Sequence, residues 1–165
     1  MAITFNIDEI YTMAQQIERN GADFYNKAAE NTADAEAARM LRELAAMEVD
    51  HEKTFTQMKA ELARHERATS GYDPAGEGAL YLHAMVEGKI FDFTVKPADA
   101  LTGAESLPDL LQTAIGLEKD SILFYVTMKG MVPSGGGKGR IDEIIDQEVS
   151  HIATLSNKLQ AIGQG

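Results

Sequence analysis

The sequence contains two copies of a short Glu/His pattern whose residue types can bind a metal ion. Residues 48–51 read EVDH and residues 148–151 read EVSH, exactly one hundred positions apart. In a helix, positions i and i+3 share a face, so the Glu and the His of each copy point the same way. Carboxylate oxygens together with an imidazole nitrogen are suitable donors for a divalent transition metal. The candidate ligands in these two copies are Glu48, His51, Glu148 and His151.

A second repeated pattern precedes each Glu-Val-x-His by thirty residues. Residues 18–25 read ERNGADFY and residues 118–125 read EKDSILFY, so each has Glu followed by Phe-Tyr at the same spacing. Internal repeats of this kind indicate two halves related by a pseudo-twofold axis. The chemically interesting residues in this second pattern are Glu18, Tyr25, Glu118 and Tyr125.

Four long segments with helical periodicity must position these residues. We expect helices from Asn6 or Asp8 to about residue 30, from about 34 to 67, from Pro108 to about 129, and from about 140 to 161. A crossover of about forty residues, 68–107, joins the two pairs and could contain one short helix. The sequence therefore predicts an all-α four-helix bundle of two helical hairpins, in a single domain over residues 1–165.

Spacing predicts that the glutamates meet at one depth of this bundle. If the first hairpin turns near Ala33, Glu18 and Glu48 each lie fifteen residues from the turn, which is roughly 22 Å along a helix. Pro133 occupies the corresponding midpoint between Glu118 and Glu148. The Glu and His of the second helix also fall in its inward apolar series, where they replace core residues. Four carboxylates and two imidazoles are therefore expected in one layer of the core.

Such a layer needs compensation for its negative charge. Uncompensated carboxylates in a helical core are strongly unfavourable, and no Arg or Lys falls at a nearby inward position. Either the glutamates are protonated, or two divalent ions balance their four charges. Carboxylates with one imidazole per ion suit iron or manganese. One Glu from each of two helices, with Glu-x-x-His from each of the other two, is the ligand set of carboxylate-bridged di-iron bundles.

Composition excludes several other functions. The 165 residues contain 26 acidic and 15 basic side chains, for a net charge of −11. This balance argues against nucleic acid and against anionic membrane surfaces as partners. The chain has no Cys, which excludes disulfides, iron–sulfur clusters and thiol nucleophiles within it. No signal-like start or membrane-spanning run is evident, so we expect a cytoplasmic protein.

At these residues the sequence resembles the rubrerythrin-type branch of the ferritin-like superfamily, over roughly residues 8–66 and 108–161. The resemblance implies two iron ions as the cofactor, with manganese or zinc as substitutes, and no catalytic residue beyond the metal centre. By this resemblance, Glu48 and Glu148 would bridge the two ions. Glu18 and Glu118 would be terminal ligands, and His51 and His151 would each bind one ion.

Two departures from the family pattern affect the expected function. Rubrerythrins proper carry a rubredoxin-like domain whose cysteines bind iron, and this chain has no Cys. They commonly also have an extra carboxylate one turn after the third-helix Glu, where this chain has Ser121. In the family that ligand is associated with peroxide turnover, so its absence bears on peroxidase activity and leaves metal binding unaffected.

Three functions share this ligand set. The first is a di-iron oxidoreductase that reacts with peroxide or dioxygen and takes electrons from an external donor protein. The second is a ferroxidase or iron-storage protein, and the third is an interaction module that metal only stabilises. We interpret Tyr25 and Tyr125 as phenols that hydrogen-bond a ligating carboxylate across the bundle; the alternative is two core aromatics.

The crossover also bears on assembly. It carries more apolar residues than a solvated loop usually shows, which predicts a homodimer, as does the resemblance. The alternative is that the segment packs on its own bundle. The apolar residues concerned are Tyr72, Tyr81, Leu82, Met85, Ile90, Phe91 and Phe93.

Overall fold

The computed structural model describes residues 5–62, 64–67, 69–87, 96–133 and 137–163. Four long helices form its bundle: α1 (Ile7–Asn31), α2 (Ala35–Glu61), α5 (Leu107–Met131) and α6 (Lys138–Gly163). Among the described residues, the β-type pairing is one isolated bridge between Asn6 and Ser70. The predicted all-α four-helix bundle is therefore confirmed. None of the described helices combines the length and the apolar character needed to span a bilayer.

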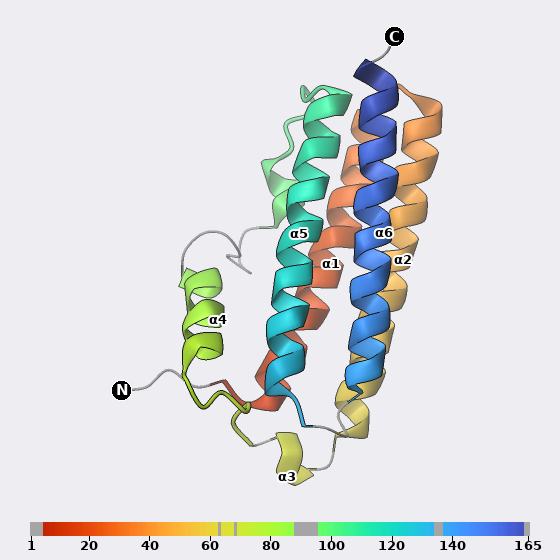
Figure 1. The fold of residues 1–165 in the computed structure, drawn as a ribbon. Helices are drawn as coiled ribbons and strands as arrows, with labels where there is room; N and C mark the ends of the chain where they lie inside the picture. The colour runs from red at the N-terminus through yellow and green to blue at the C-terminus, as the bar shows by residue number, and fades with distance from the viewer. Residues whose placement is uncertain (1–4, 63, 68, 88–95, 134–136, 164–165) are drawn as a thin grey trace.

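The helices are arranged as two hairpins side by side (Figure 1). Helix α1 contacts α2 and α5, and α6 contacts α5 and α2. The turn between α1 and α2 lies at one end of the bundle, and the connection between α5 and α6 lies at the other (Figure 1). The helices of the two Glu-Phe-Tyr patterns are therefore neighbours, and the two Glu-Val-x-His helices are neighbours as well.

Capping residues explain where three of these helices begin. The Asn6 side chain accepts a hydrogen bond from the Glu9 backbone N–H at 2.8 Å, and the Glu9 carboxylate accepts one from the Asn6 N–H at 2.9 Å. This reciprocal pair is a capping box. Asp34 and Ser106 cap α2 and α5 with a single bond each, because their side-chain oxygens accept from the backbone N–H of Ala37 and Asp109. Pro108 lies in the first turn of α5, where no backbone N–H is needed.

The second helix ends earlier than its sequence pattern predicts. Helix α2 stops at Glu61, and a separate short helix, α3, spans Arg64–Arg67. The Arg67 side chain donates to the carbonyl oxygens of Leu62 at 3.2 Å and Ala60 at 3.1 Å. These are carbonyls at the end of α2 that have no partner within the helix. The predicted continuation to Arg67 is therefore wrong, because Arg67 folds back to cap α2.

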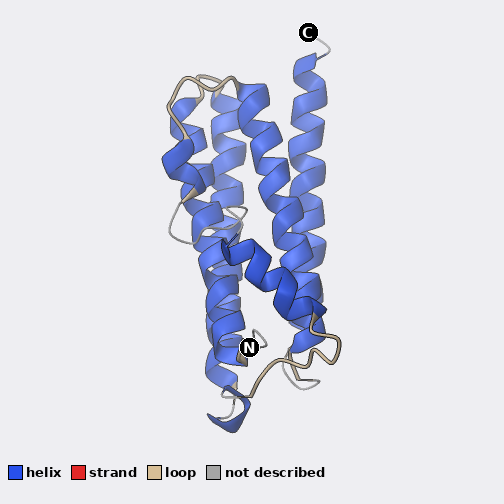
Figure 2. Cartoon of the chain, turned by 90° about the vertical axis from the view of Figure 1, so that its left-hand side faces the viewer, coloured by secondary structure: helices blue, strands red, loops and turns tan. Residues whose placement is uncertain are grey.

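The crossover contains α4 (Glu77–Glu87) and a 3₁₀ helix, η1 (Pro97–Ala100). Helix α4 contacts α5 and lies obliquely across one side of the bundle (Figure 2). Leu82 is fully buried within the chain's own core and Tyr81 packs partly against it, whereas Tyr72 is 74% exposed. Part of the apolar surface invoked for a dimer is thus covered by the bundle itself. The Met85 side chain and Ile90, Phe91 and Phe93 lie outside the described residues, so the homodimer stays a prediction, which light scattering would test.

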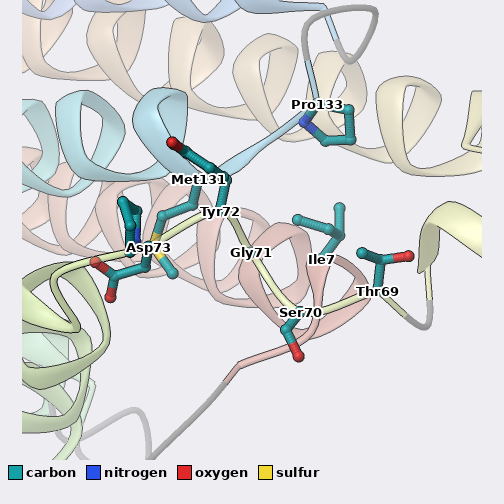
Figure 3. A pocket seen from close by; sticks show the side chains of 9 residues that line it. Ile7, Thr69, Ser70, Gly71, Tyr72, Asp73, Met131 and Pro133 are labelled. Atoms are coloured by element: carbon teal, nitrogen blue, oxygen red, sulfur yellow. The ribbon is translucent and has the colours of Figure 1, made fainter.

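A pocket of about 450 Å³ lies where the crossover meets the bundle end, beside Met131 of α5 and Ile7 of α1 (Figure 3). Its wall is held by backbone hydrogen bonds, including Tyr72 N–H to the Met131 carbonyl at 2.9 Å. Its one carboxylate, Asp73, accepts from the Ala79 N–H and so caps α4. The pocket is therefore a structural junction. Ile7, which lines it, precedes Glu18 by eleven residues, so the pocket lies roughly 16 Å along α1 from that glutamate.

The apolar core is divided into two clusters. One contains Ile17, Phe55 and Tyr125, and the other contains Phe24, Leu41 and Leu155. On α1 the boundary falls between Ile17 and Phe24, which is where Glu18 lies. A polar layer therefore interrupts the core at the depth that the repeat spacing predicts.

Candidate metal centre

The polar layer contains all six residues that the sequence singled out as metal ligands. Each is at most 3% exposed, although four are carboxylates. Burying this many ionisable groups together is unfavourable unless their charges are compensated. The six are Glu18 on α1, Glu48 and His51 on α2, Glu118 on α5, and Glu148 and His151 on α6.

The first donor group surrounds the imidazole of His51. Its Nδ1 atom lies 3.4 Å from Glu18 Oε2 and 3.1 Å from Glu148 Oε1. Glu48 joins them, and one donor atom from each of the four residues lies within 4.8 Å of the others. Three helices, α1, α2 and α6, therefore converge on one point where an ion could be held by three carboxylates and one nitrogen.

The second donor group surrounds His151 in the same manner. Its Nδ1 atom lies 2.9 Å from Glu148 Oε2, 3.2 Å from Glu48 Oε1 and 3.3 Å from Glu118 Oε1. Glu48 and Glu148 therefore belong to both groups, and Glu148 directs a different oxygen to each imidazole. The two imidazole rings are stacked, with centroids 5.6 Å apart. The arrangement offers two adjacent ion positions with two shared carboxylates.

Two buried tyrosines hold the carboxylates that are not shared. The Tyr25 hydroxyl on α1 donates to Glu118 Oε1 on α5, and the Tyr125 hydroxyl on α5 donates to Glu18 Oε1 on α1. The bonds are reciprocal between the two halves, as the pseudo-twofold relation requires. Glu18 thereby keeps Oε2 directed toward His51, whereas Glu118 presents the same Oε1 to both Tyr25 and His151. The alternative of two core aromatics without this contact does not describe these residues.

Electrostatics in the metal-free site favour proton uptake. Burial raises the pKa of Glu118 to about 9 and the pKa of Glu18 well above its usual range. Burial alone would lower the pKa of His51, but the adjacent carboxylates of Glu148 and Glu18 raise it to about 11. Burial acts to raise the pKa of Glu148, and contacts with His151 and His51 lower it to about 2. Without a divalent ion, protons therefore balance the charge of this layer.

The donor atoms that face one another fit a pair of metal ions. Several are buried and lack a hydrogen-bond partner: Glu18 Oε2, Glu48 Oε1, both oxygens of Glu148, and Nδ1 of His51 and His151. Buried polar atoms without partners are rare in folded proteins, and a bound ion is one way to satisfy them. Within the described part of the chain, the ion pairs of these carboxylates are with the two histidines and include no Lys or Arg.

Two residues near the site were not identified from the sequence. The Nε2–H of His51 donates to Gln147 Oε1 at 2.7 Å. Gly21 lies so close to Glu48 that a Cβ added to it would be 2.8 Å from Glu48 Oε2. The repeat has Met47 at the position of Gln147 and Ser121 at that of Gly21, so neither residue belongs to the repeated pattern that identified the six candidate ligands.

Ser121 does not replace the extra carboxylate of rubrerythrins. Its hydroxyl donates to the backbone carbonyl of Leu117, one turn earlier on α5, at 3.0 Å. The side chain thereby satisfies its hydrogen bond within its own helix. The site therefore has four carboxylates at this level among the described residues.

Comparisons with known proteins agree with this fold. The rubrerythrin family model matches residues 2–59, which include α1 and most of α2. A crystal structure from Thermotoga maritima, provisionally described as a ferritin-like diiron-carboxylate protein, is similar to this chain with a TM-score of 0.68 and 25% identity. The match covers 95% of this chain and 96% of the other. No protein with a curated description matches. The chain is thus similar to rubrerythrins over residues 2–59, and its fold is similar to that of a ferritin-like diiron-carboxylate protein; its 165 residues contain no Cys for a rubredoxin-type iron site.

Proposed function

We propose that this rubrerythrin-like chain is a non-haem di-iron oxidoreductase that reduces hydrogen peroxide or dioxygen with electrons from an external donor protein. The observation that carries the proposal is the pair of buried donor groups that share Glu48 and Glu148. A single-ion site has no need of shared carboxylates or of a second imidazole. The paired arrangement therefore favours two ions held side by side.

Each ligand has a proposed role in this centre. Glu48 and Glu148 would hold both ions, because both belong to both groups. Glu18 and His51 would complete the first position, and Glu118 and His151 would complete the second. Three carboxylates and one imidazole per ion suit iron, with manganese or zinc as substitutes.

The iron pair, when bound, supplies the electrons that reduce the oxidant. The chain's own residues provide its surroundings. Tyr25 and Tyr125 orient the terminal carboxylates through their hydroxyls, which is a common way to fix a ligand's geometry. The two apolar clusters above and below the layer exclude water from the site. The imidazoles must release their Nδ1 protons for metal to bind, so binding depends on pH.

Ser121 favours a second candidate function, oxidation of ferrous ion for iron handling or storage. The hydroxyl of Ser121 is bonded to its own helix, and it offers no carboxylate to an ion. Given the family association of that ligand with peroxide turnover, slow peroxide reduction with retained ferrous oxidation would indicate this function.

The decisive experiment measures both reactions on iron-loaded protein. We expect peroxide consumption with a chemical reductant, two electrons for each peroxide, and we expect the rate to be lost in Glu48→Ala. Glu43→Ala is the matched control, because Glu43 lies on the same helix and is 71% exposed in its side chain. Oxidation of added ferrous ion without peroxide turnover would favour the ferroxidase. Absence of both reactions in fully loaded protein would overturn the proposal and favour a structural metal.

A further inference from the structure

The two imidazoles differ in what supports their outer nitrogens. His51 donates its Nε2–H to Gln147 Oε1 at 2.7 Å, across the contact between α2 and α6. The Nε2 atom of His151 is buried and has no hydrogen-bond partner. The ligand sets of the two positions are otherwise equivalent, since each has one terminal glutamate, the two shared glutamates and one histidine.

The internal repeat explains the difference. Gln147 on α6 lies immediately before Glu148, and the residue one hundred positions earlier, before Glu48 on α2, is Met47. By the pseudo-twofold relation, Met47 stands toward His151 as Gln147 stands toward His51. A thioether is only a weak acceptor, whereas an amide oxygen is a strong one. The repeat therefore provides an acceptor for one histidine and none of comparable strength for the other.

This asymmetry bears directly on metal binding. Both imidazoles turn Nδ1 toward the carboxylates, so an ion bound there requires the remaining proton to be on Nε2. For His51 that tautomer is stabilised by Gln147, which also fixes the ring and raises the basicity of Nδ1. For His151 the same tautomer places an N–H in a buried environment without a partner, which is unfavourable.

We propose that the two metal positions are inequivalent: the ion beside His51 binds more tightly because Gln147 supports that histidine, and the ion beside His151 is the exchangeable one. The inference rests on the proposed di-iron function, and it adds which of the two ion positions exchanges its metal more readily. The exchangeable position is where incoming iron or an oxidant would gain access. Gln147 is a positioning residue, since it acts through His51.

The test is a reciprocal exchange between the two halves of the repeat. Metal-free protein is titrated with Co²⁺ against a coloured chelator, and the visible spectrum is followed. In the wild type we expect two affinities that differ by roughly ten- to a hundredfold, the usual effect of a ligand-supporting hydrogen bond. Gln147→Met should lower the tighter affinity by about that factor, and Met47→Gln should raise the weaker one. Gln147→Glu keeps an acceptor oxygen and should retain tight binding.

Further variants assign each effect to one position and control for structural damage. In His151→Ala, which retains the position of His51, Gln147→Met should still weaken Co²⁺ binding; in His51→Ala it should have no effect. Gln57→Met is the matched control, because Gln57 is an exposed glutamine on α2 that donates a hydrogen bond to Glu61 and has no other side-chain partner among the described residues. Equal effects of Gln147→Met and Gln57→Met would overturn the inference while leaving metal binding intact. A wild type that binds no Co²⁺ or Fe²⁺ would instead overturn the proposed function.

Discussion

Replacing Gly21 by Ala tests whether Glu48 is fixed by metal. Gly21 lies in the middle of α1, and an added Cβ would lie 2.8 Å from Glu48 Oε2, 3.3 Å from its Cδ and 3.4 Å from its Cγ. Ordinary contacts between such atoms need roughly 3.5 Å, so the Glu48 carboxylate would have to move by about 0.5 Å or more. Whether that movement is tolerated depends on what holds the carboxylate.

The metal-free and metal-loaded forms should respond differently to this substitution. In the metal-free protein the carboxylate is the free end of a flexible side chain and can swing away. Ala is favoured over Gly in a helix interior by about 1 kcal/mol, so the free energy of unfolding should stay level or rise by up to that amount. In the loaded protein a shift of about 0.5 Å exceeds the tolerance of about 0.2 Å for metal–ligand distances. Because Glu48 belongs to both donor groups, we expect metal affinity to fall roughly tenfold or more.

Denaturant unfolding of chelated and metal-loaded samples, with metal content determined in parallel, separates the two effects. Gly116→Ala is the control, since Gly116 is also inside a helix and an added Cβ there would meet nothing within 4 Å. It should stabilise both forms equally. If Gly21→Ala retained two ions with wild-type affinity and the full metal-induced stabilisation, the assignment of Glu48 to both positions would be refuted.

Three further outcomes follow from the same geometry. Glu48→Ala removes a ligand from both donor groups and should leave zero or one metal ion per chain, whereas Glu118→Ala should retain partial occupancy. Elemental analysis of both variants distinguishes these outcomes. Two ions in Glu48→Ala would contradict the bridging assignment. The metal-free protein should lose stability as pH rises from about 5 to about 9. Burial raises the pKa values of Glu18 and Glu118, so the folded state holds protons that the unfolded chain has released, and each such proton changes the unfolding free energy by about 1.4 kcal/mol per pH unit. Urea midpoints of chelated protein would show this, and midpoints that rise with pH would disprove it. Tyr125→Phe removes the hydrogen-bond donor to Glu18 Oε1 and should change the optical spectrum of the metal-loaded centre while both ions are retained. Tyr25→Phe should have the same effect through Glu118. An unchanged spectrum in both variants would argue against orientation of the carboxylates by the phenols.

The helices could be predicted from the sequence because their signals are local. The Asn6 cap, the Pro108 start and the inward apolar series depend on residues within one or two turns. The end of α2 could not be predicted in this way. Its helical pattern runs on to Arg67, but the chain turns at Leu62 and the Arg67 side chain bonds back to the carbonyls of Ala60 and Leu62. Only the tertiary structure shows that this Arg serves as a cap.

The six clustered side chains could also be found from sequence, since a fixed spacing on paired helices fixes their depth. Their supporting contacts could not, because they depend on how neighbouring helices are rotated against each other. The bond from His51 to Gln147 spans ninety-six positions, and the contact between Gly21 and Glu48 joins α1 to α2. Nothing local to Gln147 or Gly21 distinguishes them from an exposed glutamine or an ordinary helical glycine.

Each donor group depends on both hairpins. The group around His51 takes Glu148 from the second hairpin, and the group around His151 takes Glu48 from the first. The hydrogen bonds from Tyr25 and Tyr125 also cross from one hairpin to the other. A hairpin by itself therefore contains neither ion position in complete form, and it lacks the tyrosine that orients its terminal glutamate. A metal ion bound at either position would therefore stabilise the association of the two hairpins. A substitution that loosens the packing between the hairpins should, for the same reason, weaken metal binding even where it changes no ligand.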